Sequence, residues 1–436
     1  MSLGKRKPNQ PDLFISHAKL PSSPGHPFYA ALNRLLEEEC FDDQLEMLCA
    51  PYYRDGGRPS IPAGVYFRML FVGFFENIDS QRGIAWRCSD SLSLRQFLGL
   101  SMSESVPDHS SLTRWRQRLP FEVHEEVFVM ILDMARRKKL LKGKRIGVDS
   151  TTLEANAAMK SIVRKKTKES YKAFLHQLAK DSGVENPTDE DLRRFDRNRP
   201  GKTASNDEWE SPSDPDSRIT RMKDGRTKMA YKADHAVDLD SDIVVAAPIY
   251  HGNDMDVSTL LDTVDLARSN LYVAGAGRKP LDVVADKGYF STESLREMSS
   301  QGHRPFVAEK KGQRRWRKSD AERRAAVYAN RRRLRSKTGR LLQRLRSEKT
   351  ERSFAHVCDQ GGARRSWIRG IGEVGKRYLM QVAARNLSAI MRALFGVGKP
   401  RGLTAVSARI FALYITIVEF VARLRVLFSR PLAAIG

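Results

Sequence analysis

The sequence has 436 residues, of which 41% are hydrophobic and 29% charged, a composition typical of a globular protein with a sizeable core and more than one structural unit. Lys and Arg number 76 against 52 Asp and Glu, and the resulting net charge of +24 favours a polyanionic partner such as nucleic acid over a protein that is merely basic. The four cysteines are scattered and form no Cys-x-x-Cys pair, which argues against a zinc ribbon and a disulfide framework.

Neither end of the sequence is predicted to be a membrane anchor. Residues 1–26 are polar, contain several prolines and are expected to be a flexible lead-in, without the apolar run of a signal peptide. Residues 399–436 are predicted to form an apolar carboxyl-terminal helix, but its longest uncharged run, residues 410–418, is too short to span a bilayer. We therefore expect a cytoplasmic protein that associates with the nucleoid when it is bound to DNA.

Residues 27–140 have a helical pattern and are predicted to form an amino-terminal domain for DNA binding or assembly. Residues 62–75 are apolar nearly all round, so they should form its buried helix. A later helix, which begins near residue 108, carries the candidate DNA contacts Arg114, Trp115, Arg116 and Arg118. Short helices that end in an arginine-rich one fit a helix-turn-helix unit, and they fit equally a helical bundle with solvated arginines.

Two short apolar runs close on an aspartate. Residues 146–153 read Ile-Gly-Val-Asp-Ser-Thr-Thr-Leu, which predicts a buried strand that delivers Asp149 at its carboxyl end. The pattern recurs at residues 281–289, where a strand is expected to end at Asp286, with a glycine soon after. A third acid, Glu351, lies in a stretch predicted to be helical. Two strand-end aspartates and a helix-borne glutamate could converge on a pair of divalent metal ions, an arrangement suited to phosphodiester chemistry.

Each acid also has a local interpretation. Asp149 could cap the turn that follows it, and Asp286 could pair with Lys287. Glu351 could bridge to Arg352 or Arg346 on a helix surface. The repeated strand-to-aspartate pattern beside a basic segment favours the catalytic interpretation.

The residues between the first two acids predict an α/β fold. A charged insertion at about 160–217 should hold a helix to about residue 180 and then a loop. A hairpin with its turn at residues 239–242 follows, then a helix capped by Asn253 or Asp254 that runs to about residue 268. With the Asp286 strand and a helix at 292–301, this order predicts a mixed sheet with helices on its faces.

A basic segment at about 304–345 continues to the third acid, and residues 304–352 hold 19 Lys and Arg against five acidic residues. Cations and aromatic rings alternate within it, a mixture that can bind phosphates and stack on unpaired bases, although a solvated charged face would also explain it. The candidate DNA-binding residues of this segment are Arg314, Arg315, Trp316, Arg331, Arg332, Arg333, Arg344, Arg346 and Arg352.

The motifs around the three acids resemble those of bacterial insertion-sequence transposases of the DDE type, which have a ribonuclease H-like catalytic domain. The resemblance rests on Gly-Val-Asp-Ser-Thr-Thr at 147–152, Ala-Asp-Lys-Gly-Tyr at 285–289 and Glu-Arg-Ser-Phe-Ala-His at 351–356. Residues 56–62 and 107–112 resemble the helical amino-terminal region of such proteins, and Arg-Asn-Leu at 385–387 resembles the helix that closes their catalytic domain.

The resemblance implies a catalytic domain over residues 141–398 in which Asp149, Asp286 and Glu351 bind Mg²⁺, with Mn²⁺ as a substitute. It also implies an enzyme that cleaves the element's ends and joins them to target DNA, with double-stranded DNA as its partner and a homodimer or larger assembly on that DNA. A repressor derived from a transposase, and a nuclease without strand transfer, are the alternatives.

One departure from the family's pattern concerns the glutamate region. Related enzymes carry an arginine four residues before the glutamate and a lysine seven residues after it, and these places hold Ser347 and Cys358 here. Arg344, Arg346, Lys349 or Arg352 could replace them. Glu348 is a rival to Glu351 as the third acid.

Overall fold

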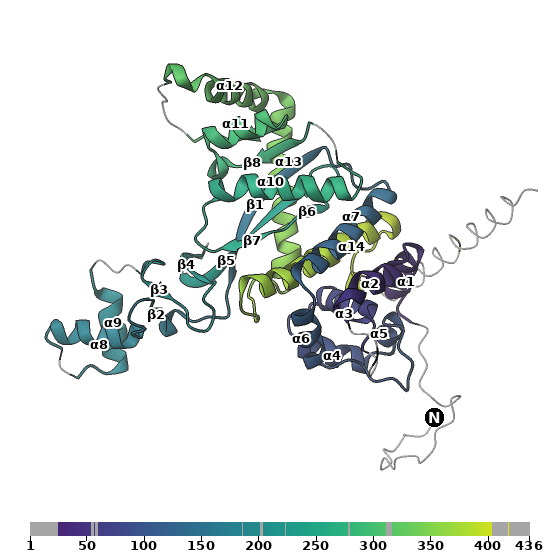
Figure 1. Cartoon of the computed structure of the whole chain (residues 1–436), viewed down its shortest axis with the longest axis horizontal. Coiled ribbons are helices and arrows are strands. Elements are labelled where there is room, and N and C mark those ends of the chain that lie inside the picture. The colour runs from purple at the N-terminus through teal and green to yellow at the C-terminus, as the bar shows by residue number, and fades with distance from the viewer. Residues whose placement is uncertain are drawn as a thin grey trace, which may run out of the picture.

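The computed structural model describes residues 25–53, 56, 60–184, 186–200, 204–222, 224–277, 280–310, 316–402 and 417. Most of the predicted lead-in, most of the predicted carboxyl-terminal helix, Arg314 and Arg315 lie outside these ranges. Figure 1 shows a helical amino-terminal part, a central sheet with helices on it, and an arm that projects from one edge of the sheet. Within the described ranges, no helix is both long and apolar enough to cross a membrane.

The amino-terminal part is all helical, as predicted. Its helices are α1 (Pro27–Glu38), α2 (Phe41–Cys49), α3 (Ala63–Glu76), α4 (Gln81–Asp90), α5 (Leu92–Phe97), α6 (His109–Arg118) and α7 (Phe121–Arg137). The prediction of a buried helix at 62–75 is confirmed, because nearly every residue of α3 is buried, Arg68 included. The others pack round it, and the long α14 (Ile371–Phe395) lies along both α3 and α7.

The central sheet is mixed, with the strand order β4-β5-β1-β8-β9. Its strands are β1 (Arg145–Glu154), β4 (Arg218–Arg221), β5 (Thr227–Asp238), β8 (Asp282–Ala285) and β9 (Arg304–Val307), and two short strands, β6 (Val244–Ala246) and β7 (Ile249–His251), also pair with β5. β1 and β5 are antiparallel, whereas β1, β8 and β9 are parallel. The predicted α/β class, with a mixed sheet flanked by helices after an all-α domain, is confirmed.

Helices cover both faces of this sheet. They are α10 (Asp256–Val273), α11 (Thr292–Ser300), α12 (Ala321–Arg335) and α13 (Lys337–Phe354), which a π-helical turn (Ala355–Asp359) extends. Asp149 of β1 contacts α13, while the next residue, Ser150, contacts Asp256 of α10. Because successive strand residues point to opposite faces, α13 and α10 lie on opposite faces of the sheet.

The predicted hairpin is confirmed, and its neighbouring helix differs from the prediction. The turn between β5 and β6 is held by Asp238, whose carboxylate accepts a hydrogen bond from the Ser241 hydroxyl at 2.8 Å. Neither Asn253 nor Asp254 caps the next helix, because Asp254 instead accepts a hydrogen bond from the backbone N–H of His251 at 3.0 Å. The helix α10 therefore starts at Asp256 and runs to Val273, beyond the predicted end.

The charged insertion forms the arm. It contains α8 (Tyr171–Asp181), α9 (Asp189–Asn198) and a two-stranded ribbon of β2 (Val163–Arg164) and β3 (Trp209–Glu210). The predicted helix begins at residue 171 rather than near 160, and a second helix forms in the stretch predicted to be a loop. Thr188 and Asp191 form a capping box at the start of α9, and Leu192 packs with Leu175 and Ala179, so the arm has a small core of its own.

Candidate active site

The first two acids lie next to each other in the sheet. Gly147 of β1 pairs with Val284 of β8 in parallel register. Asp149 and Asp286 each lie two residues further on, and Asp286 keeps an extended backbone (φ −82°, ψ −177°), so the same register brings the acids to neighbouring positions. The prediction that Asp149 ends its strand is wrong. β1 continues to Glu154, because the β-branched Thr151 and Thr152 suit a strand and pair with β5.

Two side chains of α13 hold the Asp149 carboxylate. Its Oδ2 accepts a hydrogen bond from Nη1 of Arg346 at 2.9 Å and one from the Thr350 hydroxyl at 3.2 Å, and Oδ1 accepts one from the Ser150 backbone N–H at 2.9 Å. Gly147 makes room for this contact, since a Cβ there would lie 2.9 Å from Cγ of Arg346. The first acid is therefore already paired with a cation of its own chain.

Asp286 caps the short turn that follows its strand. Its Oδ1 accepts the backbone N–H of Gly288 at 2.7 Å, and within the described residues no hydrogen bond reaches its other carboxylate oxygen. The position that a Cβ on Gly288 would occupy is 2.9 Å from Oδ1 of Asp286 and 2.7 Å from Oδ2 of Asp256. Asp256 is thus a further acid beside Asp286. The sequence gives no sign that Asp256 approaches Asp286, because the acids around residue 255 indicate only the start of a helix.

A buried polar network holds the Asp256 carboxylate in place. Oδ1 of Asp256 accepts the Ser150 hydroxyl at 3.0 Å and pairs with Nζ of Lys232 at 2.8 Å. Lys232 also donates to the Thr259 hydroxyl, which in turn donates to the buried Asp234 at 2.7 Å. Burial raises the pKa of Asp234 to about 6, against the opposite effect of Lys232. The buried Lys232 therefore pairs with two carboxylates, those of Asp256 and Asp234.

Glu351 lies on a helix, α13, as predicted, and α13 contacts Asp149. Its neighbour Thr350 contacts Asp149, and the exposed Glu351 carboxylate accepts a hydrogen bond from Ser347 at 2.9 Å. With 100° of rotation per residue, Glu351 lies about 100° round the helix from Thr350, whereas Glu348 lies about 160° away. Glu348 also pairs with Arg352 on that far side. The helix geometry favours Glu351 over Glu348.

The three acids do not yet form a closed ligand set. Within the described ranges, no group of three or more His, Cys, Asp or Glu side chains is placed to hold a metal ion. The reason is visible in the contacts, because Asp149 is bound to Arg346 and Glu351 is bound to its own helix at Ser347. Asp149, within β1, and Asp286, directly after β8, offer carboxylate oxygens, which are ligands that fit a divalent cation.

A buried histidine fastens α13 to the sheet. His235 is the β5 partner of Asp149, and its ring stacks on Phe354 of α13 with the centroids 4.2 Å apart. Its two nitrogens contact the hydroxyls of Ser353 at 2.8 Å and Tyr378 at 2.9 Å. Complete burial lowers the pKa of His235 well below 6.5, so the ring is neutral. The position of the helix that carries Glu351 therefore depends on a neutral imidazole.

Low pH should weaken the attachment of α13 to the sheet through His235. Below pH 6.5 the unfolded chain binds a proton at His235 that the folded chain does not, so the stability is complete above that pH and falls as the pH drops. We expect the melting temperature to fall more steeply between pH 7 and pH 5 in the natural protein than in His235→Gln, measured by differential scanning calorimetry. Equal slopes for the two proteins would show that His235 does not titrate with unfolding.

The arginine-rich helix of the amino-terminal part is only partly exposed. Trp115 and Arg116 of α6 are buried, and Nε of Arg116 pairs with Glu373 of α14 at 2.6 Å. Their placement does not support the predicted DNA contact, because α6 turns this face to the protein core. Arg114 and Arg118 are exposed, although the Arg118 guanidinium lies 4.6 Å from the centre of the Tyr53 ring.

Several cations of the basic segment are bound within the protein. Arg331 pairs with Glu309 at 2.6 Å, and Arg333 donates to the carbonyl of Pro305 at 2.9 Å. Arg352 pairs with Glu348 and, at 3.5 Å, with Asp242. Trp316 is half-buried. Among the predicted DNA-binding residues of this segment that the structure describes, Arg332 and Arg344 are exposed and have no ion pair, so these two candidates remain free to meet DNA.

Two family models match the chain. Residues 17–118 match a family described as "Transposase domain (DUF772)", and residues 187–387 match one described as "Transposase DDE domain". The chain belongs to the DDE transposases. This family comprises enzymes of DNA cleavage and transfer that typically use divalent metal ions. The second match includes Asp286 and Glu351 and begins after Asp149. The choice of Asp149 as the first acid therefore rests on its sequence motif and on its position beside Asp286 in the sheet.

The remaining comparisons add little to this assignment. No curated protein matches the chain. A solved structure described as "Mos1 transposase paired-end complex with left transposon end" is 10% identical, with a TM-score of 0.19, and the match covers 71% of this chain and 82% of that one. A likeness this weak carries no argument about the site of the transposase.

The Arg346–Asp149 pair should compete with a metal ion for the same carboxylate. In Arg346→Gln we expect Mg²⁺ to bind the transposase about fivefold more tightly, since a partly buried ion pair contributes ~1 kcal/mol. Isothermal titration calorimetry measures this affinity. Arg344→Gln, two residues earlier on the exposed side of α13, should leave it unchanged. Weaker Mg²⁺ binding in Arg346→Gln would contradict competition at Asp149.

Proposed function

We propose that this DDE transposase cleaves the ends of an insertion sequence and transfers the freed strands to target DNA by Mg²⁺-dependent phosphodiester chemistry, with Mn²⁺ as a substitute. The observation that carries the proposal is the neighbouring placement of Asp149 and Asp286 in one sheet, beneath the helix that bears Glu351. One acid lies within β1 and another directly after β8, and this attachment to the sheet favours chemistry that depends on accurate positioning.

Asp149, Asp286 and Glu351 would hold the metal ions. Bound divalent ions make water nucleophilic at neutral pH and stabilise charge on the leaving oxygen. Within the chain, Glu351 would release Ser347 and turn toward the two aspartates. Arg346 would then leave Asp149, and its guanidinium would be available to a phosphate of the bound DNA.

The unusual glutamate region supports this role for Arg346. Ser347, which stands where related enzymes have an arginine, donates a hydrogen bond to Glu351. Cys358, which stands where they have a lysine, is 1% exposed and lies 3.9 Å from the Tyr378 hydroxyl, so its position offers nothing to a phosphate. Arg346, which touches an acid, and the exposed Arg344 are the nearby cations best placed to replace the missing pair.

The partner of this site would be double-stranded DNA, both the element's ends and the target. Because two ends must be joined to one target, we infer a homodimer or a larger assembly on DNA. Besides Arg346, the exposed residues Arg114, Arg118, Arg332 and Arg344 are the candidates for phosphate contacts among the predicted set that the structure describes.

The test is an assay on supercoiled plasmid that carries the DNA flanking this gene. With Mg²⁺ we expect nicks at the two ends and products in which an end is joined to new DNA, and with EDTA neither. Binding without nicking would overturn the proposal in favour of a repressor. Nicking at the ends without joined products would overturn it in favour of a nuclease.

A further inference from the structure

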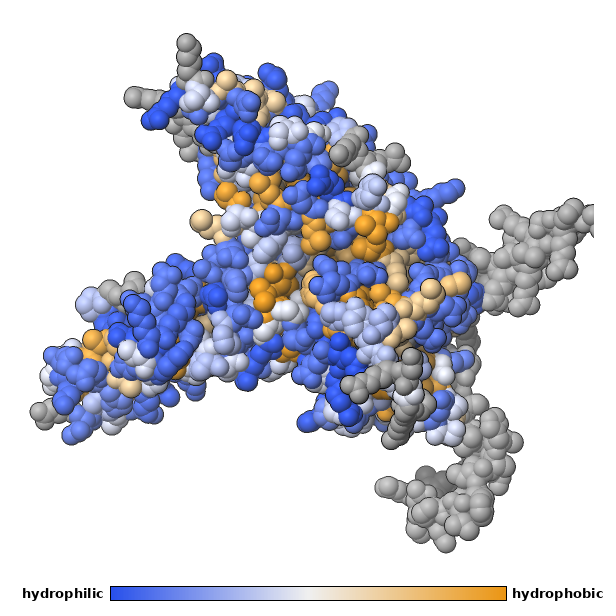
Figure 2. Space-filling model, in the orientation of Figure 1, coloured by the Kyte–Doolittle hydropathy of each residue, from blue (hydrophilic) through white to orange (hydrophobic). Residues whose placement is uncertain are grey.

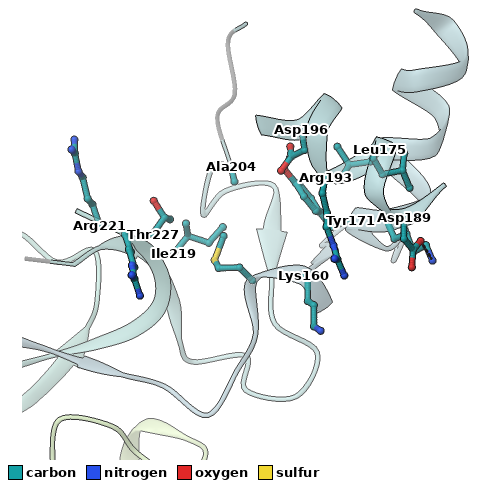
Figure 3. A pocket seen from close by; sticks show the side chains of 14 residues that line it. Lys160, Tyr171, Leu175, Asp189, Arg193, Asp196, Ala204, Ile219, Arg221 and Thr227 are labelled. Carbon is teal, nitrogen blue, oxygen red and sulfur yellow. Dashed lines mark hydrogen bonds and ion pairs between the residues drawn. The ribbon is translucent and has the colours of Figure 1, made fainter. Parts of the chain in front are cut away.

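The arm of the transposase carries a groove that the proposed active site does not use. A cavity of about 880 Å³ lies between the arm helices and the hairpin of β4 and β5. Figure 3 shows Arg193, Asp189 and Tyr171 on one side of it and Arg221, Ile219 and Thr227 on the other. Figure 2 shows that the surface of the arm is mostly hydrophilic, with apolar residues between its helices.

The groove has an apolar floor and a cationic rim. Leu175, Leu192 and Ile219 line it and are each at least nine-tenths buried. Lys160, Arg193, Arg221 and Arg226 also line it and are exposed at its rim.

The acids of the groove are already neutralised, whereas its cations are not. Asp189 pairs with Lys172 at 2.7 Å, and Asp196 pairs with Arg199 at 3.1 Å. In the described part of the chain, the side chains of the four rim cations named above take part in no ion pair and no hydrogen bond. Four cations that form no ion pair, although Arg193 lies near enough to Asp189 to lower its pKa, give the hollow a positive field that attracts an anion, and more strongly a polyanion.

The two terminal segments of the chain have the wrong charge to occupy the groove. Residues 1–24 contain four Lys and Arg and one Asp, and residues 403–436 contain four Arg and one Glu. Both segments are cationic and would be repelled by the rim. The backbone ridge of a DNA duplex has the required charge, and its sugar carbons can contact the apolar floor while its phosphates lie along the rim.

The groove also lies within reach of a duplex bound at the acids. His235, the strand partner of Asp149, and Thr227, which lines the groove, are eight residues apart on β5. At about 3.3 Å per residue this is roughly 26 Å along the strand, or about eight base pairs of duplex.

We propose that the arm groove binds the phosphodiester backbone of duplex DNA, about eight base pairs from the position of cleavage. The proposal rests on the proposed function for the identity of the polyanion. Contact through the backbone makes this binding independent of sequence, so the arm would orient the duplex rather than select it.

The test is the salt dependence of DNA binding by the full chain, measured in EDTA by the fluorescence anisotropy of a labelled duplex. The variant Lys160→Gln/Arg221→Gln/Arg226→Gln should lose roughly 2.7 from the slope of log affinity against log salt, since each phosphate contact contributes about 0.9. At 0.15 M salt its affinity should fall roughly tenfold or more.

The matched control is Lys166→Gln/Lys180→Gln/Arg197→Gln, which removes the same charge from exposed arm positions outside the groove. Its slope should change by less than about one. Equal losses in the two variants, a loss confined to single-stranded DNA, or unchanged DNA binding would each overturn the proposal. So would a changed oligomeric state of the groove variant without DNA, measured by light scattering, because the occupant would then be protein. Since no cleavage is measured, failure of the proposed chemistry would not affect this result.

Discussion

Replacement of Asp149 or Asp286 by Asn is expected to abolish Mg²⁺-dependent cleavage of the element's ends and to leave DNA binding intact. Each change keeps the shape of the side chain and removes the negative charge that a divalent cation requires. Metal ions supply several kcal/mol of transition-state stabilisation, so the cleavage rate should fall by about a thousandfold or more. Single-turnover cleavage of an end-labelled duplex measures the rate.

Asp262→Asn is the matched control for both variants. Asp262 lies exposed on α10, and its replacement should leave the cleavage rate within about twofold, as is usual for a surface change. Anisotropy with the same duplex, in EDTA, should give one affinity for all four proteins. Cleavage at the natural rate by either Asp149→Asn or Asp286→Asn would remove that residue from the proposed site, and parallel loss of binding would show a folding defect instead.

The third acid should be identified by a comparison within one helix. Glu351→Gln is expected to lower the cleavage rate by about a hundredfold or more, because it removes a carboxylate that can turn toward Asp149 and Asp286. Glu348→Gln should have little effect, because Glu348 points away from the sheet and pairs with Arg352 on the exposed side of α13.

These two variants control for each other, since they make the same substitution three residues apart. Circular dichroism should show equal helix content and closely similar melting curves. The reverse order of effects, with Glu348→Gln inactive and Glu351→Gln active, would contradict the assignment and would require α13 to rotate about its axis when DNA binds.

Local patterns in the sequence predicted most elements of this fold and marked Asp149, Asp286 and Glu351 as catalytic candidates. Apolar runs set β1 and β8, the turn after Asp238 set the hairpin, and helical spacing set α13, because each depends on residues that are neighbours along the chain. The order of these elements was enough to predict a mixed sheet with helices on its faces. Element ends were less certain, as the extension of β1 through Asp149 shows, because the antiparallel partner that extends it is some 80 residues away.

The contacts between residues far apart in the sequence were decided only by the tertiary structure. The sequence shows that Arg346 is a cation near the third acid, but not that it pairs with Asp149 across 197 positions. The burial of Trp115 against Tyr53 and Tyr66, and the approach of Asp256 to Asp286, likewise follow from packing. The physical reason is that periodicity fixes which face of an element is apolar, whereas the partner that covers this face, and the polar side chains at its margin, are selected only when the elements pack together.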